Sequence, residues 1–316
     1  MTAAEALAAA RAGDRGCLAR LLSSIERGDG EGREVARLTY AAAGAAATVG
    51  ITGAPGAGKS TLTSALVAAA RKHRQRLAVL AIDPSSPFSG GAILGDRVRM
   101  GDHVLDDGVY IRSMATRGHL GGLALATPEA VRLLDAVGFG WVLVETVGVG
   151  QVEVDVASAA DTTVVVVNPG WGDAVQANKA GLMEVADVFV VNKADRPGVA
   201  QTRRDLQSML DLTRRGDGAG WRPPVVETVG TTGEGSDRLW DAIGDHQAHL
   251  ARTGALEDRR SARRRAELAL VVEQRLRARA EELVSAKDRR VTEAAVATGE
   301  LDPWTAADRL LGPLGA

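Results

Sequence analysis

The chain has 316 residues, 45% of them apolar and 25% charged, which is the composition of an ordinary globular protein. Its formal net charge of −2 provides no overall attraction to nucleic acid or to an anionic membrane, so we expect neither as a partner. Its one cysteine, Cys17, excludes an internal disulfide and any zinc or iron–sulfur centre built on spaced cysteines.

Residues 1–45 are predicted to form an N-terminal helical extension. Alanine, leucine, arginine and glutamate dominate this stretch, and Gly13, Gly16 and the glycines of 28–32 are the expected breaks between helices. The stretch lacks the apolar segment of a secretory signal, and the longest uncharged apolar run, 162–167, is far shorter than the roughly 20 residues of a membrane-spanning helix. We therefore expect a cytoplasmic protein.

From residue 46 the pattern changes to short apolar runs rich in β-branched residues. Most of these runs are separated by segments long enough to hold a helix, which indicates a parallel sheet buried on both faces. We therefore predict a doubly wound α/β domain with a mainly parallel sheet over residues 46–255. The predicted strands are 47–52, 77–82, 109–112, 141–145, 162–167, 188–191 and 225–228.

The first predicted strand leads into a phosphate-binding loop. Residues 53–60 read Gly-Ala-Pro-Gly-Ala-Gly-Lys-Ser and match G-x-x-x-x-G-K-[ST] between a strand and a helix. Glycines let backbone N–H groups surround phosphate oxygens, and the following helix presents the positive end of its dipole. Lys59 is expected to contact the β- and γ-phosphates, and the Ser60 hydroxyl to bind Mg²⁺. The predicted phosphate-binding residues are Gly56, Ala57, Gly58, Lys59, Ser60 and Thr61.

Acidic residues end two of the predicted strands. Asp83 and Glu145 each follow an apolar run, and ligands bind at the carboxyl ends of the strands in a doubly wound sheet. Both acids are therefore predicted to reach the magnesium shell or the attacking water. Asp96, on a glycine-rich stretch, is a third candidate magnesium ligand, and Gly148 is a candidate N–H donor to the γ-phosphate. A helix cap or a turn is the alternative role for each acid.

A glycine-rich loop after the fifth predicted strand is a candidate switch. Residues 169–173 read Pro-Gly-Trp-Gly-Asp and lead on to Lys179. Asp173 and Lys179 could form a movable ion pair there, and a structural role for both is an equally open alternative.

The sixth predicted strand leads into a base-selecting motif. Residues 192–195 read Asn-Lys-Ala-Asp and match the N-K-x-D pattern of GTPases. The carboxylate of Asp195 can accept both the N1–H and the exocyclic amine of guanine, whereas adenine offers no such pair of donors. Asn192 is expected to support the loop, and the Lys193 stem to cover the base. The pattern favours GTP over ATP, and a third base-contacting loop is predicted at Thr228, Val229 and Gly230.

The remaining residues, 256–316, are predicted to form a helical arm. In the stretch 257–287, apolar residues are spaced 4, 3, 3, 4, 4 and 3 apart, close to the 3.5 period of paired helices. A helix of about 31 residues is about 46 Å long, which favours pairing with a second copy of the chain. A helix folded back over the sheet is the alternative. The arginines at 259–265 are offset by glutamates and are predicted to form a solvated face.

Together these motifs resemble the MeaB/ArgK family of GTPases, the methylmalonyl-CoA mutase-associated proteins. The specific part is the Asp-Pro-Ser-Ser-Pro of 83–87 and the Glu-Thr-Val-Gly-Val-Gly-Gln of 145–151. The resemblance implies a homodimer joined through C-terminal helices, and GTP hydrolysis coupled to loading and protection of adenosylcobalamin on the mutase. It assigns the phosphate, magnesium and hydrolysis roles to Lys59, Ser60, Asp83, Asp96 and Glu145, and an additional switch to Asp173 and Lys179.

Other GTPase-related classes remain as alternatives. A metallochaperone GTPase is expected to carry clusters of cysteine or histidine, and one cysteine with scattered histidines argues against it. A kinase linked to arginine/ornithine transport is a second alternative, and the Asn-Lys-Ala-Asp motif counts against its use of ATP.

Overall fold

The computed structural model describes residues 1–84, 101–103, 105–116, 120–146, 159–170, 184–212 and 220–312. The chain divides into two compact units, Met1–Arg263 and Arg264–Ala316. Within the described ranges, no helix is long and apolar enough to span a bilayer.

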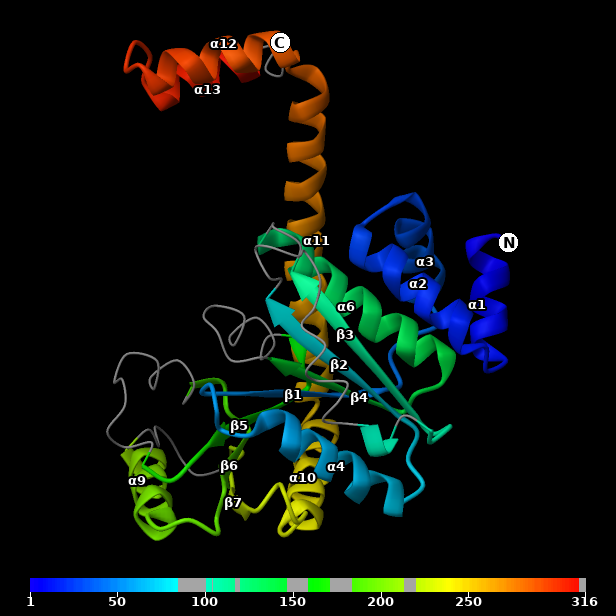
Figure 1. Cartoon of the computed structure of the whole chain (residues 1–316), viewed down its shortest axis with the longest axis vertical. Helices are drawn as coiled ribbons and strands as arrows, with labels where there is room; N and C mark the ends of the chain where they lie inside the picture. Colours follow the sequence, from blue (N-terminus) through cyan, green and yellow to red (C-terminus); the bar gives the residue numbers. More distant parts are fainter. Residues whose placement is uncertain are drawn as a thin grey trace. The chain divides into compact units, whose positions relative to one another are not determined.

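A seven-stranded sheet forms the centre of the first unit, and all neighbouring strands in it are parallel (Figure 1). The order is β3-β2-β4-β1-β5-β6-β7, so β1, the first strand in the chain, lies in the middle. This arrangement confirms the predicted doubly wound α/β fold. The strands are β1 (Ala47–Gly53), β2 (Leu77–Pro84), β3 (Val109–Thr116), β4 (Trp141–Thr146), β5 (Thr162–Val167), β6 (Val188–Asn192) and β7 (Val225–Thr228).

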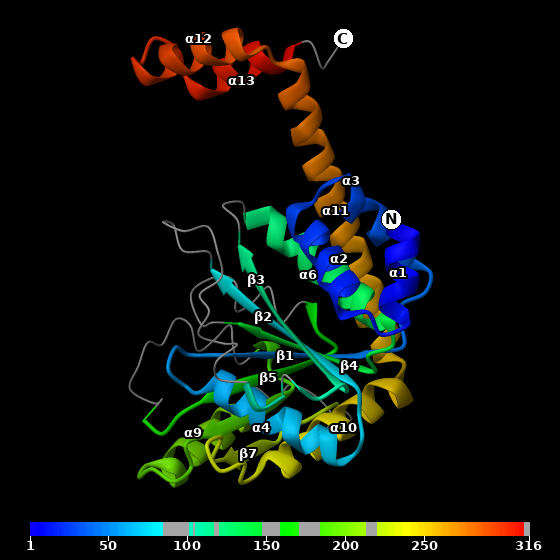
Figure 2. The ribbon, with the colours of Figure 1, turned by 45° about the vertical axis from the view of Figure 1, so that its right-hand side comes forward.

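Helices cover both faces of the sheet because the strand side chains alternate between two apolar layers (Figure 2). Leu80 and Ile82 of β2 pack with α6 (Leu120–Val137), whereas Val79 of the same strand packs on the other side with α4 (Lys59–Lys72) and α10 (Ser236–Thr253). Over β5 and β6, a third apolar group packs against α9 (Val199–Leu212). The valine-rich strands are thus buried on both faces, as their continuous apolar runs predict.

Strand β3 extends further than its apolar run predicts. It pairs residue by residue with β2 from Val109 to Thr116, because backbone hydrogen bonds do not depend on side-chain polarity. As an edge strand it can carry a charged side chain, and Arg112 donates to Glu26 at 3.0 Å. A short 3₁₀ turn, η1 (Gly101–His103), precedes this strand.

Three helices form the N-terminal segment and pack with α6: α1 (Ala3–Arg11), α2 (Arg15–Arg27) and α3 (Gly30–Tyr40). Each begins at a capping side chain, respectively Thr2, Asp14 and Asp29. Gly28 ends α2 in the left-handed conformation, as expected of a break. The predicted break at Gly16 is wrong, since Asp14 caps α2 ahead of it and Gly16 lies inside the helix.

The chain ends in α11 (Ala255–Leu283), α12 (Ala286–Ala297) and α13 (Pro303–Leu311). The prediction of one helix over 257–287 is wrong at its end. Ser285 accepts a hydrogen bond from the backbone N–H of Asp288 at 3.1 Å, so it caps α12 instead of continuing α11. In the second unit α12 and α13 lie against each other, with Thr292 and Ala306 buried.

Candidate functional site

The carboxyl ends of β1, β4, β6 and β7 bring most of the predicted nucleotide-binding residues to one edge of the sheet. Ile51, near the end of β1, pairs with Glu145 in β4, and Asn192 at the end of β6 pairs with Thr228 in β7. Four predicted residues, Asp96, Gly148, Asp173 and Lys179, lie outside the described residues.

The phosphate loop begins at Gly53, where only glycine fits. Its φ is 136°, and a Cβ there would lie 2.1 Å from the carbonyl oxygen of Val166 in β5. Gly58, at the start of α4, has φ of 88°, and a Cβ there would lie 2.5 Å from Nδ2 of Asn192. The loop is therefore packed closely against β5 and against the end of β6.

The ammonium of Lys59 lies within this loop. The side chain is buried, and Nζ donates to the carbonyl oxygens of Gly53 at 2.6 Å and Ala54 at 3.1 Å. Thr61 follows in the first turn of α4 and is half-buried. The arrangement places one positive charge at the amino end of a helix, which is the electrostatic requirement of a phosphate site.

Ser60 and Glu145 meet beside the loop. The Ser60 hydroxyl donates to Oε1 of Glu145 at 2.5 Å, and the Glu145 side chain is buried. Two side-chain oxygen atoms from different elements are thus held together, and oxygen atoms are what a hard cation such as Mg²⁺ prefers. Asp83 lies in β2 one residue after Ile82, which pairs with Thr146 of β4, so its backbone is at the same edge; its side chain lies outside the described part.

Asn192 connects the phosphate loop to the end of β7 and the loop that follows it. The side chain is buried; Nδ2 donates to the carbonyl oxygen of Ala57 at 2.8 Å. Oδ1 accepts from the hydroxyl of Thr228 at 3.2 Å and from the N–H of Gly230 at 3.1 Å. Asn192 therefore supports the phosphate loop and the loop after β7 at once, and Thr228 and Gly230 contact it directly.

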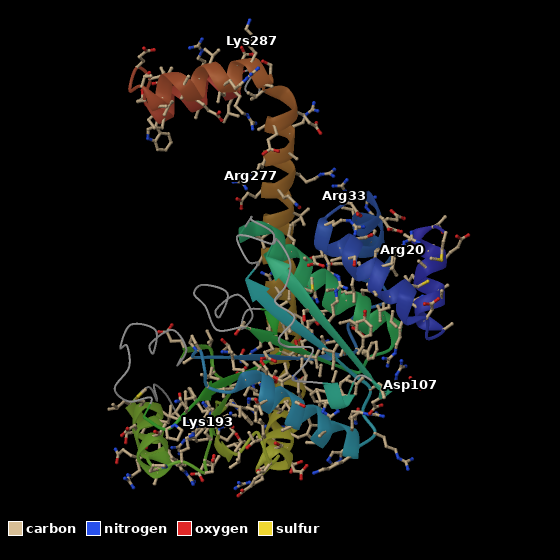
Figure 3. All side chains as sticks on the ribbon, viewed as in Figure 1. Arg20, Arg33, Asp107, Lys193, Arg277 and Lys287 are labelled. Carbon is tan, nitrogen blue, oxygen red and sulfur yellow. The ribbon has the colours of Figure 1, made fainter. Side chains whose placement is uncertain are left out.

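The other residues of the base motif are more exposed. Lys193, labelled in Figure 3, adopts φ of 59°. Its Nζ donates to the carbonyl oxygen of Gly56 at 2.6 Å. Asp195 is exposed, and the N–H of Ala194 bonds to the carbonyl oxygen of Thr228 at 3.0 Å. Val229 is buried and its N–H bonds to Glu234 at 2.9 Å, which closes the loop after β7.

Residues 18–285 match the model of a protein family described as methylmalonyl Co-A mutase-associated GTPase MeaB. The chain belongs to the MeaB family. The MeaB-family chain is a P-loop GTPase, as its sequence motifs predict.

Relatives of this MeaB-family chain come from bacteria, archaea and mammals. A Pyrococcus abyssi protein with a GTPase name is 49% identical over 95% of this chain and 93% of its own length. The Escherichia coli GTPase ArgK is 37% identical over 81% of this chain and 79% of its own. The mouse mitochondrial methylmalonic aciduria type A homolog is 34% identical over 95% and 76%. The crystal structure of a LAO/AO transport system kinase, 27% identical, has a TM-score of 0.71 and covers 99% of this chain and 98% of that one.

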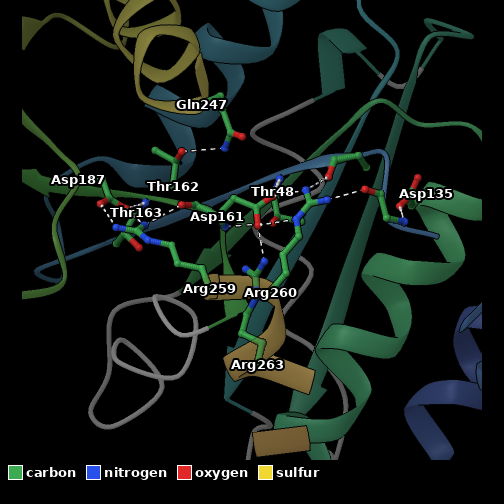
Figure 4. Close-up of polar contacts among 12 residues, drawn as sticks. Thr48, Asp135, Asp161, Thr162, Thr163, Asp187, Gln247, Arg259, Arg260 and Arg263 are labelled. Atoms are coloured by element: carbon green, nitrogen blue, oxygen red, sulfur yellow. Dashed lines mark hydrogen bonds and ion pairs between the residues drawn. The ribbon is translucent and has the colours of Figure 1, made fainter. Parts of the chain in front are cut away.

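A polar network of this MeaB-family chain, not foreseen from its sequence, lies at the opposite edge of the sheet (Figure 4). Asp161 and Asp187 directly precede β5 and β6 and are buried. Arginines of α11 bind both carboxylates. The predicted solvated face is wrong for Arg260 and Arg263, whose side chains are 17% and 24% exposed, whereas Arg259 binds Asp187 and stays 41% exposed. The available signal was an acid directly before each of two valine-rich strands, and the sequence did not indicate which residues bind these acids.

Burial and charge together shift the pKa values of Asp161 and His246 in this network. Burial would raise the pKa of Asp161, but the hydrogen bond from Arg260 and the charges of Arg263 and Arg260 outweigh burial, and the pKa lies below its ordinary value. His246 is fully buried, with Nδ1 2.8 Å from the Thr162 hydroxyl and Nε2 3.2 Å from the Asp187 carboxylate. Burial lowers the pKa of His246 to about 4, so its ring is neutral near pH 7.

A cavity of about 530 Å³ lies away from the nucleotide edge, where α2 meets the amino ends of β2 and β3. Arg71 on its wall is bound by both carboxylate oxygens of Asp106, and Arg76 lies 5.1 Å over the ring of Phe139. Two of its arginines, Arg71 and Arg15, are paired with Asp106 and Asp107, and the third lies on an aromatic ring, so we assign no charged ligand to it.

Proposed function

We propose that this GTPase is a chaperone that gates the loading of adenosylcobalamin onto methylmalonyl-CoA mutase and protects the loaded cofactor. The observation that carries the proposal is the match of residues 18–285 to a family described as mutase-associated. The mouse relative, whose name refers to methylmalonic aciduria, supports the same metabolic setting. GTP binding and hydrolysis would then regulate the interaction with the mutase.

In this proposal GTP lies along the edge that carries the phosphate loop and the base motif. Residues 56–61 and Gly148 hold the phosphates, and Lys59 stabilises the negative charge that develops on them during hydrolysis. Asp195 selects guanine, with support from Asn192 and Lys193 and from the loop 228–230. The buried position of Lys59 and the exposure of Asp195 support this division of roles.

Mg²⁺ fits the same edge. Ser60 and Glu145 offer oxygen ligands 2.5 Å apart, and Asp83 and Asp96 are the proposed further ligands. The ion would neutralise phosphate charge when bound. Asp83 and Glu145 are the proposed groups that orient the attacking water, while Asp173 and Lys179 are the proposed additional switch.

We also propose a cytoplasmic homodimer joined through the C-terminal helices. Leu268, Val272 and Leu276 of α11 are each at least 47% exposed. They recur every fourth residue and so share one face of the helix. An apolar face of this kind is suited to pairing with a second copy of the same helix.

The experiment that tests the chaperone function is GTP hydrolysis by the purified protein with and without a cobalamin-dependent acyl-CoA mutase from the same source. ATP serves as the control nucleotide. We expect slow hydrolysis of GTP alone, accelerated by the mutase. A GTPase rate that is indifferent to the mutase, together with no co-elution of the two proteins, would contradict the proposed partner.

A kinase linked to arginine/ornithine transport is the second candidate, because one similar solved structure is that of a LAO/AO transport system kinase. The two functions differ in where the γ-phosphate goes. With γ-labelled nucleotide, the GTPase releases all label as inorganic phosphate, whereas a kinase transfers part of it to a protein or a small acceptor.

A further inference from the structure

Two of the strands that carry nucleotide-binding residues also carry polar anchors at their other ends. β1 ends at the phosphate loop and β6 ends at Asn192, with β5 between them in the sheet. At the amino ends of the strands, the Asp161 carboxylate accepts from the N–H of Thr48 in β1 at 3.1 Å. The Asp187 carboxylate accepts from the N–H of Thr163 in β5 at 2.8 Å. Each aspartate therefore ties its own strand to the next one.

The first turns of α11 hold both aspartates (Figure 4). Arg260 donates to Asp161 at 2.7 Å, and Arg263 binds the same carboxylate. Arg259 donates to both oxygens of Asp187 at 2.9 Å and to the carbonyl oxygen of Asp161 at 2.8 Å. One helical segment thus fixes the starts of three adjacent strands relative to one another.

The nucleotide ends of the same strands have little room to move. Gly53 lies against the carbonyl of Val166 in β5, and Gly58 lies against the amide of Asn192, closely enough that neither could carry a Cβ. A hydrogen-bonded strand is stiff along its length, so a displacement at its start is carried to its end. A few tenths of an ångström between β1 and β6 would therefore change the spacing of the phosphate loop and the base motif.

We propose that Arg259, Arg260 and Arg263 are positioning residues for GTP binding, acting from the opposite edge of the sheet by fixing the relative positions of β1, β5 and β6. Within the described ranges, their hydrogen bonds go to Asp161, Asp187 and the backbone of Gly44 and Ala46, and not to a nucleotide-binding residue. Because they belong to α11, a change in this part of the helix alters nucleotide affinity. The inference concerns GTP binding alone and is independent of the mutase and of dimer formation.

The test is the affinity of the full chain for fluorescent GTP and GDP analogues. In the double variant Arg259→Gln/Arg263→Gln, each aspartate keeps another partner, namely Arg260 for Asp161 and the N–H of Thr163 for Asp187. We expect GTP binding to weaken roughly 3- to 30-fold. The KM for GTP should rise by a similar factor, with a smaller change in kcat, and Arg259→Lys/Arg263→Lys should restore part of the affinity.

Two controls separate positioning from stability. Arg27→Gln makes the same chemical change in an exposed ion pair of α2 with Asp29. Val35→Ala removes buried apolar volume in α3, which packs with α1, α2 and α6, and should lower the thermal midpoint. Both should bind GTP like the wild type. If the double variant loses thermal stability but keeps its GTP affinity within twofold, the arginines are structural only and the proposal is wrong.

A second measurement uses the unaltered protein, so it does not depend on any variant folding. By reciprocity, a site that controls GTP affinity must itself respond to GTP. Saturating GDP or GTP should slow hydrogen exchange of the amides of Asp161 and Asp187 and of the first turns of α11. Unchanged exchange there, alongside slower exchange in the phosphate loop, would overturn the proposal.

Discussion

At the scale of single residues, the nucleotide edge is built from side chains that bond to the backbone of neighbouring loops. Asn192 joins the phosphate loop to the loop after β7, and Lys193 reaches the carbonyl of Gly56. These residues support the loops, whereas Asp195 is exposed at the same edge. We therefore expect Asp195 to determine which base is bound and Asn192 to maintain the geometry of the loops.

Replacing Asp195 with asparagine should change the preferred base. The amide can still accept one hydrogen bond, but it places a donor where guanine also has a donor, so GTP binding should weaken by roughly 100-fold. Xanthosine triphosphate, with an oxygen at position 2, should bind the variant better than GTP does. Competition between the two nucleotides measures the shift. Asp211→Asn, an equivalent change at an exposed position of α9, is the control. If the Asp195→Asn variant keeps its full preference for GTP, the assignment of Asp195 to guanine selection is wrong.

The buried neutral His246 should make folding sensitive to mild acid. Its pKa of about 4 in the folded protein lies below the value of about 6.5 in an unfolded chain, so the unfolded state binds the proton more readily. The stabilisation is complete above about pH 6.5 and is lost as the pH falls towards 4. Between pH 7.5 and 5 the loss is about 2 kcal/mol. Urea unfolding at both pH values measures this loss of stability. The His246→Gln variant should lose the part of the pH dependence that comes from the histidine. An equal pH dependence in the variant and the wild type would contradict the prediction.

At the scale of elements, the strands were predictable and their polar anchors were not. The runs of valine in β5 and β6 favour buried strands of a parallel sheet, and the phosphate loop carries its own signature between β1 and α4. Asp161 and Arg260 are 99 residues apart in sequence, and nothing local indicates that they meet. The end of α11 depends on one capping serine, Ser285, within a segment that otherwise favours a helix.

The exposed apolar face of α11 should determine the oligomeric state. Replacing Leu268 and Leu276 with glutamate places like charges on the proposed helix–helix contact, so the dimer should dissociate into monomers. Light scattering after size-exclusion chromatography measures the mass. Gln274→Glu, on the opposite face of the same helix, should leave the dimer intact. If both the Leu268/Leu276 variant and the control variant remain dimers like the wild type, the dimer contact lies elsewhere.

At the scale of the whole molecule, the first compact unit extends beyond the predicted boundary of the sheet domain at residue 255. It runs to Arg263 and so includes the arginines that bind Asp161 and Asp187. The predicted arm therefore begins with residues that complete the sheet domain, and only the segment from Arg264 forms a separate compact unit.

A chain shortened to residues 1–255 should therefore be much less stable than one shortened to 1–270. The shorter version leaves the fully buried Asp161 without its arginines, which costs about 3–5 kcal/mol, while the longer one keeps them. Thermal unfolding of both, with GTP binding as the check of the native fold, measures the difference. Equal unfolding midpoints would mean that Asp161 is protonated or hydrated at little cost.

The central place of β1 has a consequence for synthesis of the protein on the ribosome. The strand before the phosphate loop, β1, is synthesised early, but its two neighbours in the sheet, β4 and β5, follow about a hundred residues later. Until they are synthesised, β1 has neither of these strands to pair with. The arginines that secure the strand starts emerge later still. A nascent chain therefore has no complete GTP site until most of its length has been translated, and its valine-rich strands depend on prompt completion of the sheet to avoid aggregation.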